Sequence, residues 1–442
     1  MSLLNNQSQS VNVSSYHVFF VLKLLEIRDA KQAQISDNTH TVNIRLFFLM
    51  YLKLIFILVL SCASAHLCAT AVADVNVGRV LIADQSTATQ STAGREALKQ
   101  VFIKISGSEE TVLEPTIRRA IVNYEQYLIS SSFVQRQDIL MFEARFNQEK
   151  IITLLKATGL PIWASLRPNA TLWLAEQNQL SNIRWLNQNT AREFNQHLQQ
   201  LAFERGVNIV LPLGDLNDAM VISDFDVWTQ NTAKLMPQSN RYGTVFTISA
   251  TLKPITENMR TQYQEEAMFL EQQRALERLF NPALVESSPA NNSPQALSAI
   301  DENARFQIDW IFSNAKEVHI GKGFLADDKG AAALLVKEYA DMLARQYAFG
   351  GDSTVGDARL HKLTMQNVRS LTDYNQVIEL IRTMPQVDNV ELIGVNGSNA
   401  IFLITLSTNS AEFINLVVLD RRVRESVNTS LEEHNIQLMW QR

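Results

Sequence analysis

Ser313 and Lys316 are the residues of this sequence that come nearest to a catalytic pattern. Their spacing matches the S-x-x-K motif of penicillin-recognising enzymes, in which the lysine accepts a proton from the serine one helical turn earlier. Here the pair falls between two strand-like segments, where residues i and i+3 do not share a face, and the sequence contains no K-T-G partner motif. We therefore expect an ordinary hairpin turn and no nucleophile at this place.

An acidic group follows a buried-looking strand and consists of Asp215, Asp218, Asp224 and Asp226. Carboxylate oxygens at close spacing suit Ca²⁺ or Mg²⁺, but the turn glycine and the bidentate glutamate of a calcium loop are missing. Aspartates that come after a strand often cap the next helix or satisfy a turn. Capping is therefore the favoured prediction, and a bound cation is the alternative.

The histidines beyond residue 73 are His197, His319, His361 and His434, which lie in different elements and far apart in the sequence. They show no spacing typical of metal ligands. The sequence also lacks a Walker loop, a G-x-S-x-G elbow, an H-E-x-x-H motif and an EF-hand loop. We accordingly expect no catalytic residue, no metal site and no cofactor, and hence a protein that is not an enzyme.

Two tryptophans and an arginine are concentrated in one short stretch, at Trp163, Arg167 and Trp173. Together they could stack by cation–π contact or form an exposed interaction surface. The alternative is a core strand kinked by proline, and it is favoured because the flanking apolar residues alternate as they would in a packed strand. These three residues are the candidate interaction surface that the sequence offers.

The composition and the charge exclude several classes of protein. The chain has 442 residues, 46% hydrophobic and 19% charged, with 39 lysines and arginines against 45 aspartates and glutamates. A disordered, collagen-like or multi-spanning membrane protein is excluded, and the length predicts two or three domains. The net charge of −6 and the lack of basic runs disfavour nucleic acid as a partner, because phosphate contacts need clustered cations.

An apolar run from Phe47 to Leu60, broken by one lysine, is short for a bilayer-spanning helix, which needs about 20 apolar residues. It fits a signal peptide over residues 50–73, with a basic start, an apolar stretch and A-x-A sites for cleavage. We predict cleavage between Ala73 and Asp74 and export to the periplasm. A segment that stays uncleaved and anchors the chain in the inner membrane is the alternative.

Residues 1–49 have no role in export, so we expect a non-native or disordered extension, with translation starting at Met50. Both cysteines, Cys62 and Cys68, precede the predicted cut, so the exported chain has no disulfide. Lipidation of Cys62 is a rival interpretation, although Leu60 is bulky for the position two before a lipoprotein cysteine. Membrane contact is expected only through the uncleaved segment or a lipidated Cys62.

Changes of hydrophobic periodicity predict an α+β fold of three small domains in series. Residues 74–188 form the first, with a helical stripe that ends at Gly107. Residues 189–350 form the second, interrupted by a flexible insertion at 255–303 that begins with a charged helical segment. Residues 361–442 follow the ferredoxin-like order βαββαβ. The sheet face of this last domain away from its helices is expected to carry Thr364, Gln366, Gln437, Met439 and Gln441.

Three stretches carry a resemblance to a known family. They are REALKQVFIKISGS at Arg95 to Ser108, GLPIWASLRPNATLW at Gly159 to Trp173, and NIVLPLGDLND at Asn208 to Asp218. On these residues the chain resembles a family of uncharacterised exported proteins of Gram-negative bacteria, domain of unknown function 2066. The resemblance implies a location and an architecture, but no reaction. The α+β layout is also loosely similar to the amino-terminal domains of the Tol translocation protein and the curli secretion lipoprotein, a likeness of fold alone.

These observations favour a non-catalytic periplasmic protein that acts by binding another, unidentified envelope protein. Two alternatives stay open: an envelope hydrolase whose site assembles from distant residues, and a lipid-anchored assembly factor of the outer membrane. A compact cleft lined by aspartates or histidines would favour the hydrolase. A continuous exposed apolar surface would favour binding.

Overall fold

The computed structural model describes residues 74–136, 139–280, 303–350, 359–426 and 435–441. These residues belong to one of the two units into which the chain divides, Ala69–Arg442. The predictions for the extension, the signal segment, Cys62 and His434 lie outside them. No helix within the described ranges is both long and apolar enough to cross a bilayer.

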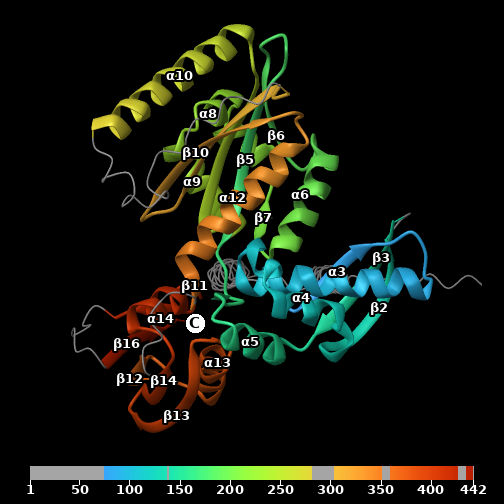
Figure 1. Ribbon diagram of the computed structural model, residues 1–442. Helices are drawn as coiled ribbons and strands as arrows, with labels where there is room; N and C mark the ends of the chain where they lie inside the picture. The colour runs from blue at the N-terminus through green and yellow to red at the C-terminus, as the bar shows by residue number, and fades with distance from the viewer. Residues whose placement is uncertain (1–73, 137–138, 281–302, 351–358, 427–434, 442) are drawn as a thin grey trace, which may run out of the picture. The chain divides into compact units, whose positions relative to one another are not determined.

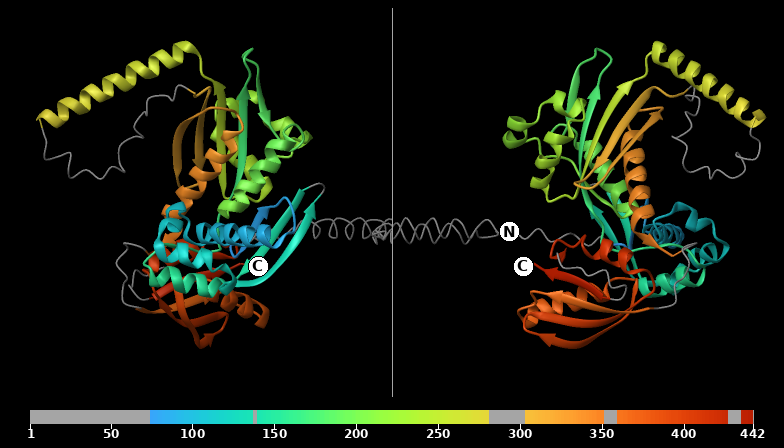
Figure 2. Two further views of the ribbon diagram at one scale, coloured as in Figure 1. Left: turned by 45° about the vertical axis from the view of Figure 1, so that its right-hand side comes forward. Right: turned by 90° about the vertical axis from the view of Figure 1, so that its left-hand side faces the viewer.

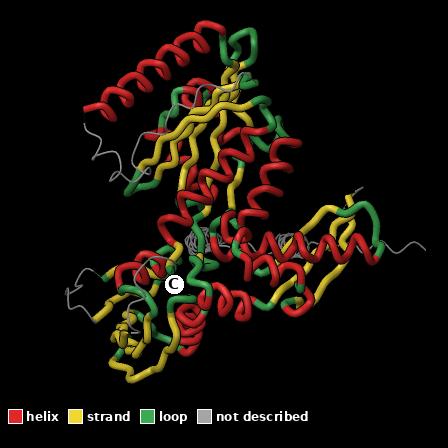
Figure 3. Tube along the Cα trace, viewed as in Figure 1, coloured by secondary structure: helices red, strands yellow, loops and turns green. Residues whose placement is uncertain are grey.

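A three-stranded antiparallel sheet with helices on it forms the first part of the unit. Its elements are β1 (Val77–Leu81), α3 (Thr87–Ser106), the 3₁₀ turn η1 (Glu109–Leu113), α4 (Pro115–Val122), η2 (Tyr124–Gln126), β2 (Leu128–Arg136), β3 (Ile139–Phe146) and α5 (Gln148–Ala157). The strand order is β1-β3-β2, and α3 lies along the sheet (Figure 3).

The sequence explains why α3 packs where it does. Ser86 caps its first turn, and Gly107, at φ 76°, ends it in the left-handed conformation, as predicted. The helix approaches β1 at Gly78, where a Cβ atom would lie 2.3 Å from the carbonyl oxygen of Ala97. The predicted apolar stripe faces inward and is confirmed by burial. It consists of Ala97, Leu98, Val101, Phe102 and Ile105.

The middle part is built on a six-stranded sheet of order β10-β9-β8-β5-β6, with β7 paired to β5 (Figure 1). Its strands are β5 (Asn169–Gln177), β6 (Ile183–Leu186), β7 (Asn208–Val210), β8 (Phe246–Pro254), β9 (Phe306–Ser313) and β10 (Val318–Leu325). β5 and β6 therefore belong to this sheet, whereas the sequence placed them in a first domain ending at residue 188. β5 is buried on both faces and shows no alternation, so its pattern cannot indicate which sheet it joins.

Helices cover both faces of this sheet. The helical elements of this part are α6 (Arg192–Arg205), α7 (Leu216–Val221), α8 (Asp224–Trp228), α9 (Thr232–Ser239), the 3₁₀ turn η3 (Asn240–Tyr242), α10 (Glu257–Phe280) and α12 (Gly330–Tyr347), of which α6, α8, α9 and α12 lie on the sheet. α12 and α6 pack together on one face, and α8 and α9 on the other (Figure 2). The first half of the expected flexible insertion is the helix α10, and the remainder, at 281–302, lies outside the described residues.

The last part is a mixed five-stranded sheet, of order β13-β14-β12-β16-β15. Its elements are β12 (Arg359–Gln366), α13 (Leu371–Arg382), β13 (Val387–Asn396), β14 (Asn399–Leu406), α14 (Ser410–Val417), β15 (Val423–Glu425) and β16 (Asn435–Trp440). The expected order holds through α14. The structure then adds β15, and β16 runs parallel to β12, whereas a ferredoxin-like sheet is antiparallel there. Three residues, Val-Arg-Glu, are too few to show a strand period.

One short stretch links all of these parts. β4 (Ile162–Trp163) pairs with β11 (Ala348–Phe349) in a two-stranded ladder. Ile162 lies in the core of the first part, Trp163 in the core under α12, and Ala164 and Leu166 in the core of the last part. We call residues 162–167 the junction segment. Three hydrophobic cores therefore share one stretch of chain.

Candidate functional site

The residues proposed as an interaction surface lie in the interior instead. Trp163 is 1% exposed, Trp173 0% and Arg167 3%. The cation–π contact does form, with the guanidinium carbon of Arg167 3.7 Å from the Trp163 ring centre. Trp173 belongs to another cluster, where its Nε1 donates to Ser239 Oγ at 2.9 Å. The prediction that these three residues form an exposed interaction surface is therefore wrong. They are packed in the core, as the alternative predicted.

Arg167 holds the junction segment through backbone carbonyl groups. Its Nε donates to the carbonyl oxygen of Ala164 at 3.0 Å, and its Nη1 to that of Gly206 at 2.7 Å. Nη1 also donates to the carbonyl oxygen of Arg205 and Nη2 to that of Lys104. A buried guanidinium is costly unless its donors are satisfied, and these four acceptors satisfy it across two parts of the chain. Its role is structural.

Lys104 is a second buried cation beside Arg167. Its side chain is fully buried, with Nζ donating to the carbonyl oxygen of Val77 at 2.7 Å. Nζ also lies 3.3 Å from the ring centre of Phe203. Burial, and then the charge of Arg167, lower the pKa of Lys104 well below its usual range. The buried amine therefore gives up its proton more readily in the folded chain than in the unfolded one.

Lys104→Met is expected to leave the free energy of unfolding at pH 7 unchanged or higher, because methionine fills a similar volume without a buried charge. An unfolded lysine titrates near pH 10.4, and the folded one at lower pH. Unfolding therefore takes up a proton between those values, and wild-type stability rises with pH there relative to the variant. Urea unfolding of both proteins at pH 7, 8, 9 and 10 measures this. Parallel stability curves would contradict it.

The four aspartates accept hydrogen bonds at helix starts and turns, as favoured. Asp215 caps α7 by accepting from the backbone N–H of Asp218 at 3.1 Å, and Ser223 and Asp226 form a capping box on α8. Asp224 accepts from the backbone N–H of Trp185 at 2.9 Å. Hydrogen bonds from Arg241 lower the pKa of Asp215 to about 2. Within the described ranges, no His, Cys, Asp and Glu side chains gather in a metal-binding group.

Ser313 and Lys316 lie at a hairpin turn, as predicted from the sequence. Ser313 ends β9 and is fully buried, with its hydroxyl directed at the carbonyl oxygen of Thr247 at 3.4 Å. Lys316 lies in the hairpin turn before β10, where its backbone N–H donates to Asn314 Oδ1. The turn is confirmed. Two of the four histidines lie in strands: His319, on β10, contacts Glu317 in the turn before that strand, and His361 is buried in β12.

An exposed apolar surface lies on α7, α8 and the loop before them, and it was not predicted from the sequence. We call it the α7–α8 surface. It consists of Leu213 (42% exposed), Leu216 (75%), Met220 (76%), Val221 (51%) and Phe225 (68%). Leu216 and Met220 are one helical turn apart and share a face. Apolar residues clustered at such exposures are typical of an interaction site.

The buried contact made from within α7 is polar, whereas the apolar anchor is the residue that follows the helix, Ile222. Asp218 is the only buried residue of α7 and accepts from Gly214 N, Gln238 Nε2 and Arg241 Nη1, each at 2.9 Å. Tyr242 Oη donates to the same carboxylate at 2.5 Å. Burial, and then this hydrogen bond, raise the pKa of Tyr242, so the phenol stays protonated. The apolar side of α7 is consequently left for solvent or a partner.

The exposed apolar side of α7 could not be predicted from its hydrophobic spacing. An amphipathic helix normally buries its apolar face, so the spacing of Leu216 and Met220 predicts a core position for them. The residues that could have revealed this arrangement are Asp218, an acceptor in the middle of the helix, and Arg241 and Tyr242, which follow 23 and 24 residues later, after two more helices. Sequence spacing cannot show that these polar groups meet.

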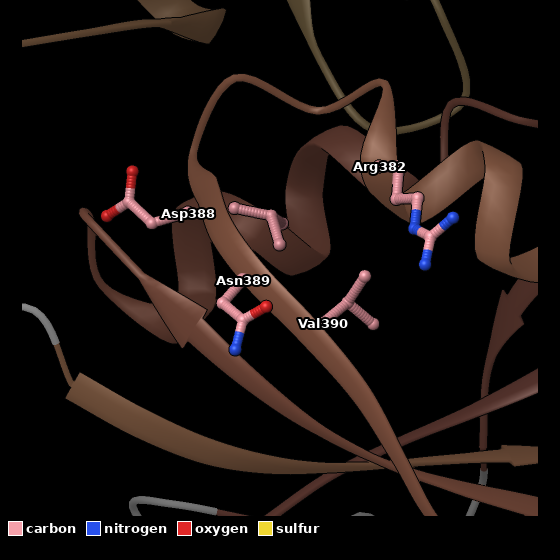
Figure 4. A pocket seen from close by; sticks show the side chains of 5 residues that line it. Arg382, Asp388, Asn389 and Val390 are labelled. Carbon is pink, nitrogen blue, oxygen red and sulfur yellow. The ribbon is translucent and has the colours of Figure 1, made fainter.

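A small cavity lies between α13 and the start of β13 (Figure 4). Its volume is about 180 Å³, and it is open to solvent. Its lining consists of Arg382, Val387, Asp388, Asn389 and Val390. In Figure 4 the Arg382 side chain extends from the helix toward Val390, and the Asp388 carboxylate points to the opposite side.

One family profile matches the chain. It is described as "Domain of unknown function (DUF8605)" and covers residues 69–164, which are 96 of the 442 residues. The match ends at Ala164, inside the junction segment, and so corresponds to the first part with β4. This domain is a different one from the exported family that the sequence resembles. A search of curated proteins finds no match.

Proposed function

We propose that the protein is a non-catalytic binding protein of the periplasm, and that it holds another envelope protein through the α7–α8 surface. The observation that carries this proposal is the outward apolar side of α7, with Leu216 75% and Met220 76% exposed. Keeping these side chains in water has a free-energy cost, which a partner would remove by covering them. The signal peptide that the sequence predicts at 50–73 and the resemblance to an exported family support the compartment.

The anchoring of α7 supports a preformed site. Asp215, Asp218 and Arg241 are tied by hydrogen bonds that fix the helix while its apolar side chains stay exposed. A surface that is already ordered loses little conformational entropy when it binds. An exposed apolar surface, rather than an acidic cleft, is what favours binding over hydrolysis here.

Leu216→Asp is expected to abolish capture of the partner while leaving the fold intact. Leu216 is the first residue of α7 and points to solvent, and an acidic residue is favourable in the first turn of a helix. The measurement is pull-down from crosslinked periplasmic fractions, followed by mass spectrometry, with thermal unfolding in parallel.

Leu371→Asp is the matched control. Leu371 is also a first helical residue, in α13, and is 74% exposed. The control variant should capture the same proteins as the wild type. If Leu216→Asp captures them equally well, with an unchanged melting temperature, the α7–α8 surface is not the binding site.

A further inference from the structure

β13 is an edge strand whose outer side has no partner strand among the described residues. It runs from Val387 to Asn396 and pairs only with β14. The outward N–H and C=O groups of an edge strand are free to pair with another extended chain. This strand is therefore a place where one more strand could be added to the sheet.

A row of apolar side chains follows this edge on the helix side of the sheet. Residues paired across an antiparallel ladder share a face, so the buried residues of β14 identify which side chains of β13 form the row. They are Val387, Val390, Leu392 and Val395, paired with Leu406, Ile404, Phe402 and Ala400. Leu392 is 38% and Val395 64% exposed, although their partners on β14 are buried. The row is thus open to an added strand.

Arg382 supplies a positive charge at one end of this row. It lines the cavity of about 180 Å³ with Val387 and Val390, and it makes no ion pair within the described part of the chain. The acidic residue of the lining, Asp388, is already paired with Lys156 at 3.1 Å. The cavity therefore has one uncompensated cation and is too small for a drug-sized ligand, which occupies ~300–1,000 Å³. A carboxylate fits both its size and its charge.

We propose that β13 binds an extended peptide segment that adds a strand to the sheet, sets apolar side chains on the row and places its terminal carboxylate on Arg382. Backbone hydrogen bonds to the strand give affinity, and every second side chain of the peptide meets the row. The site is separate from the α7–α8 surface and does not depend on it.

Two register shifts limit the length of the added strand. They fall between Val387 and Asn389 and between Leu392 and Gly394, so the longest regular stretch is Asn389–Leu392. Such bulges bend an edge and interrupt continuous pairing, which protects against open-ended association. A short peptide end therefore fits this edge better than a long strand of a second copy.

The test uses the full chain and a labelled peptide of alternating threonine and valine, six residues long, with a free carboxyl end. Fluorescence anisotropy should show saturable binding, weakened about tenfold or more by Arg382→Gln or by amidation of the peptide end. Arg345→Gln is the matched control, since Arg345 is also exposed in the last turn of a helix, α12, and should leave affinity unchanged.

Strand addition has its own readout. A peptide methylated on alternate backbone nitrogens should lose binding, because those N–H groups can no longer pair. Binding that survives methylation, or that is indifferent to Arg382→Gln, overturns the proposal. The Leu216→Asp variant should bind the peptide as the wild type does. The peptide result therefore does not depend on whether the α7–α8 surface binds a partner. Sedimentation that finds a dimer broken by Leu392→Lys would assign the edge to a second copy and also overturn it.

Discussion

Arg167→Ala is expected to lower the free energy of unfolding by about 3–5 kcal/mol, a larger loss than most point substitutions cause. The substitution removes the donor to four carbonyl oxygens and leaves them buried, because water cannot reach a side chain that is 3% exposed. It also removes the stacking partner of Trp163 and leaves a cavity. Urea unfolding followed by tryptophan fluorescence measures the change.

Arg184→Ala is the control for this experiment. Arg184 is paired with Glu176, but its side chain is 68% exposed, so the loss should be below about 1 kcal/mol. Arg167→Lys should recover only part of the stability, because an ammonium keeps the charge but not the planar fork that reaches several carbonyls. Equal effects of the two alanine substitutions would show that Arg167 does not hold the junction segment.

Gly78→Ala is expected to destabilise the protein by about 2–3 kcal/mol through overpacking. The added Cβ would lie 2.3 Å from the backbone oxygen of Ala97 and 2.7 Å from its carbonyl carbon, and backbone atoms of a packed helix cannot move aside cheaply. α3 would have to shift away from β1. Thermal and urea unfolding measure the loss.

Gly394→Ala serves as the comparison for Gly78→Ala. Gly394 also lies in a strand, β13, but a Cβ there meets no atom within 4 Å. The free energy of unfolding should stay the same or rise slightly, since alanine restricts the unfolded chain more than glycine does. Equal losses in both variants would mean that the glycine backbone, and not the close approach of α3, sets the cost.

The sequence predicted local structure well where a single element carries its own signals. The stripe of α3 with its end at Gly107, the hairpin at Ser313 and the capping aspartates are all features of neighbouring residues. These segments are long enough for the hydrophobic periodicity of a helix or a strand to be recognised in them. These predictions needed no knowledge of which elements meet.

The failures concern long-range pairing. β5 has apolar residues on both faces, so its pattern fits a central position in any sheet, and its partners β7 and β8 come about 40 and 80 residues later. The α7–α8 surface was missed for the same reason, since the groups that bond the buried Asp218 include Arg241 and Tyr242, more than 20 residues later. The added strand β15 is too short to leave a pattern.

The stretch from Ile162 to Arg167 also bears on how the chain can be divided. A fragment that ended at Ala164 would keep Ile162 in its own core but would leave the indole of Trp163 without the residues around α12 that cover it. A fragment that began at His361 would lack Ala164 and Leu166, which fill part of its hydrophobic core in the whole chain. We therefore expect each fragment to be less stable than the same residues are in the whole protein. The three larger sheets are accordingly joined through packed core residues of the junction segment, and a cut there removes buried contacts from every one of them, unlike a cut in an exposed linker.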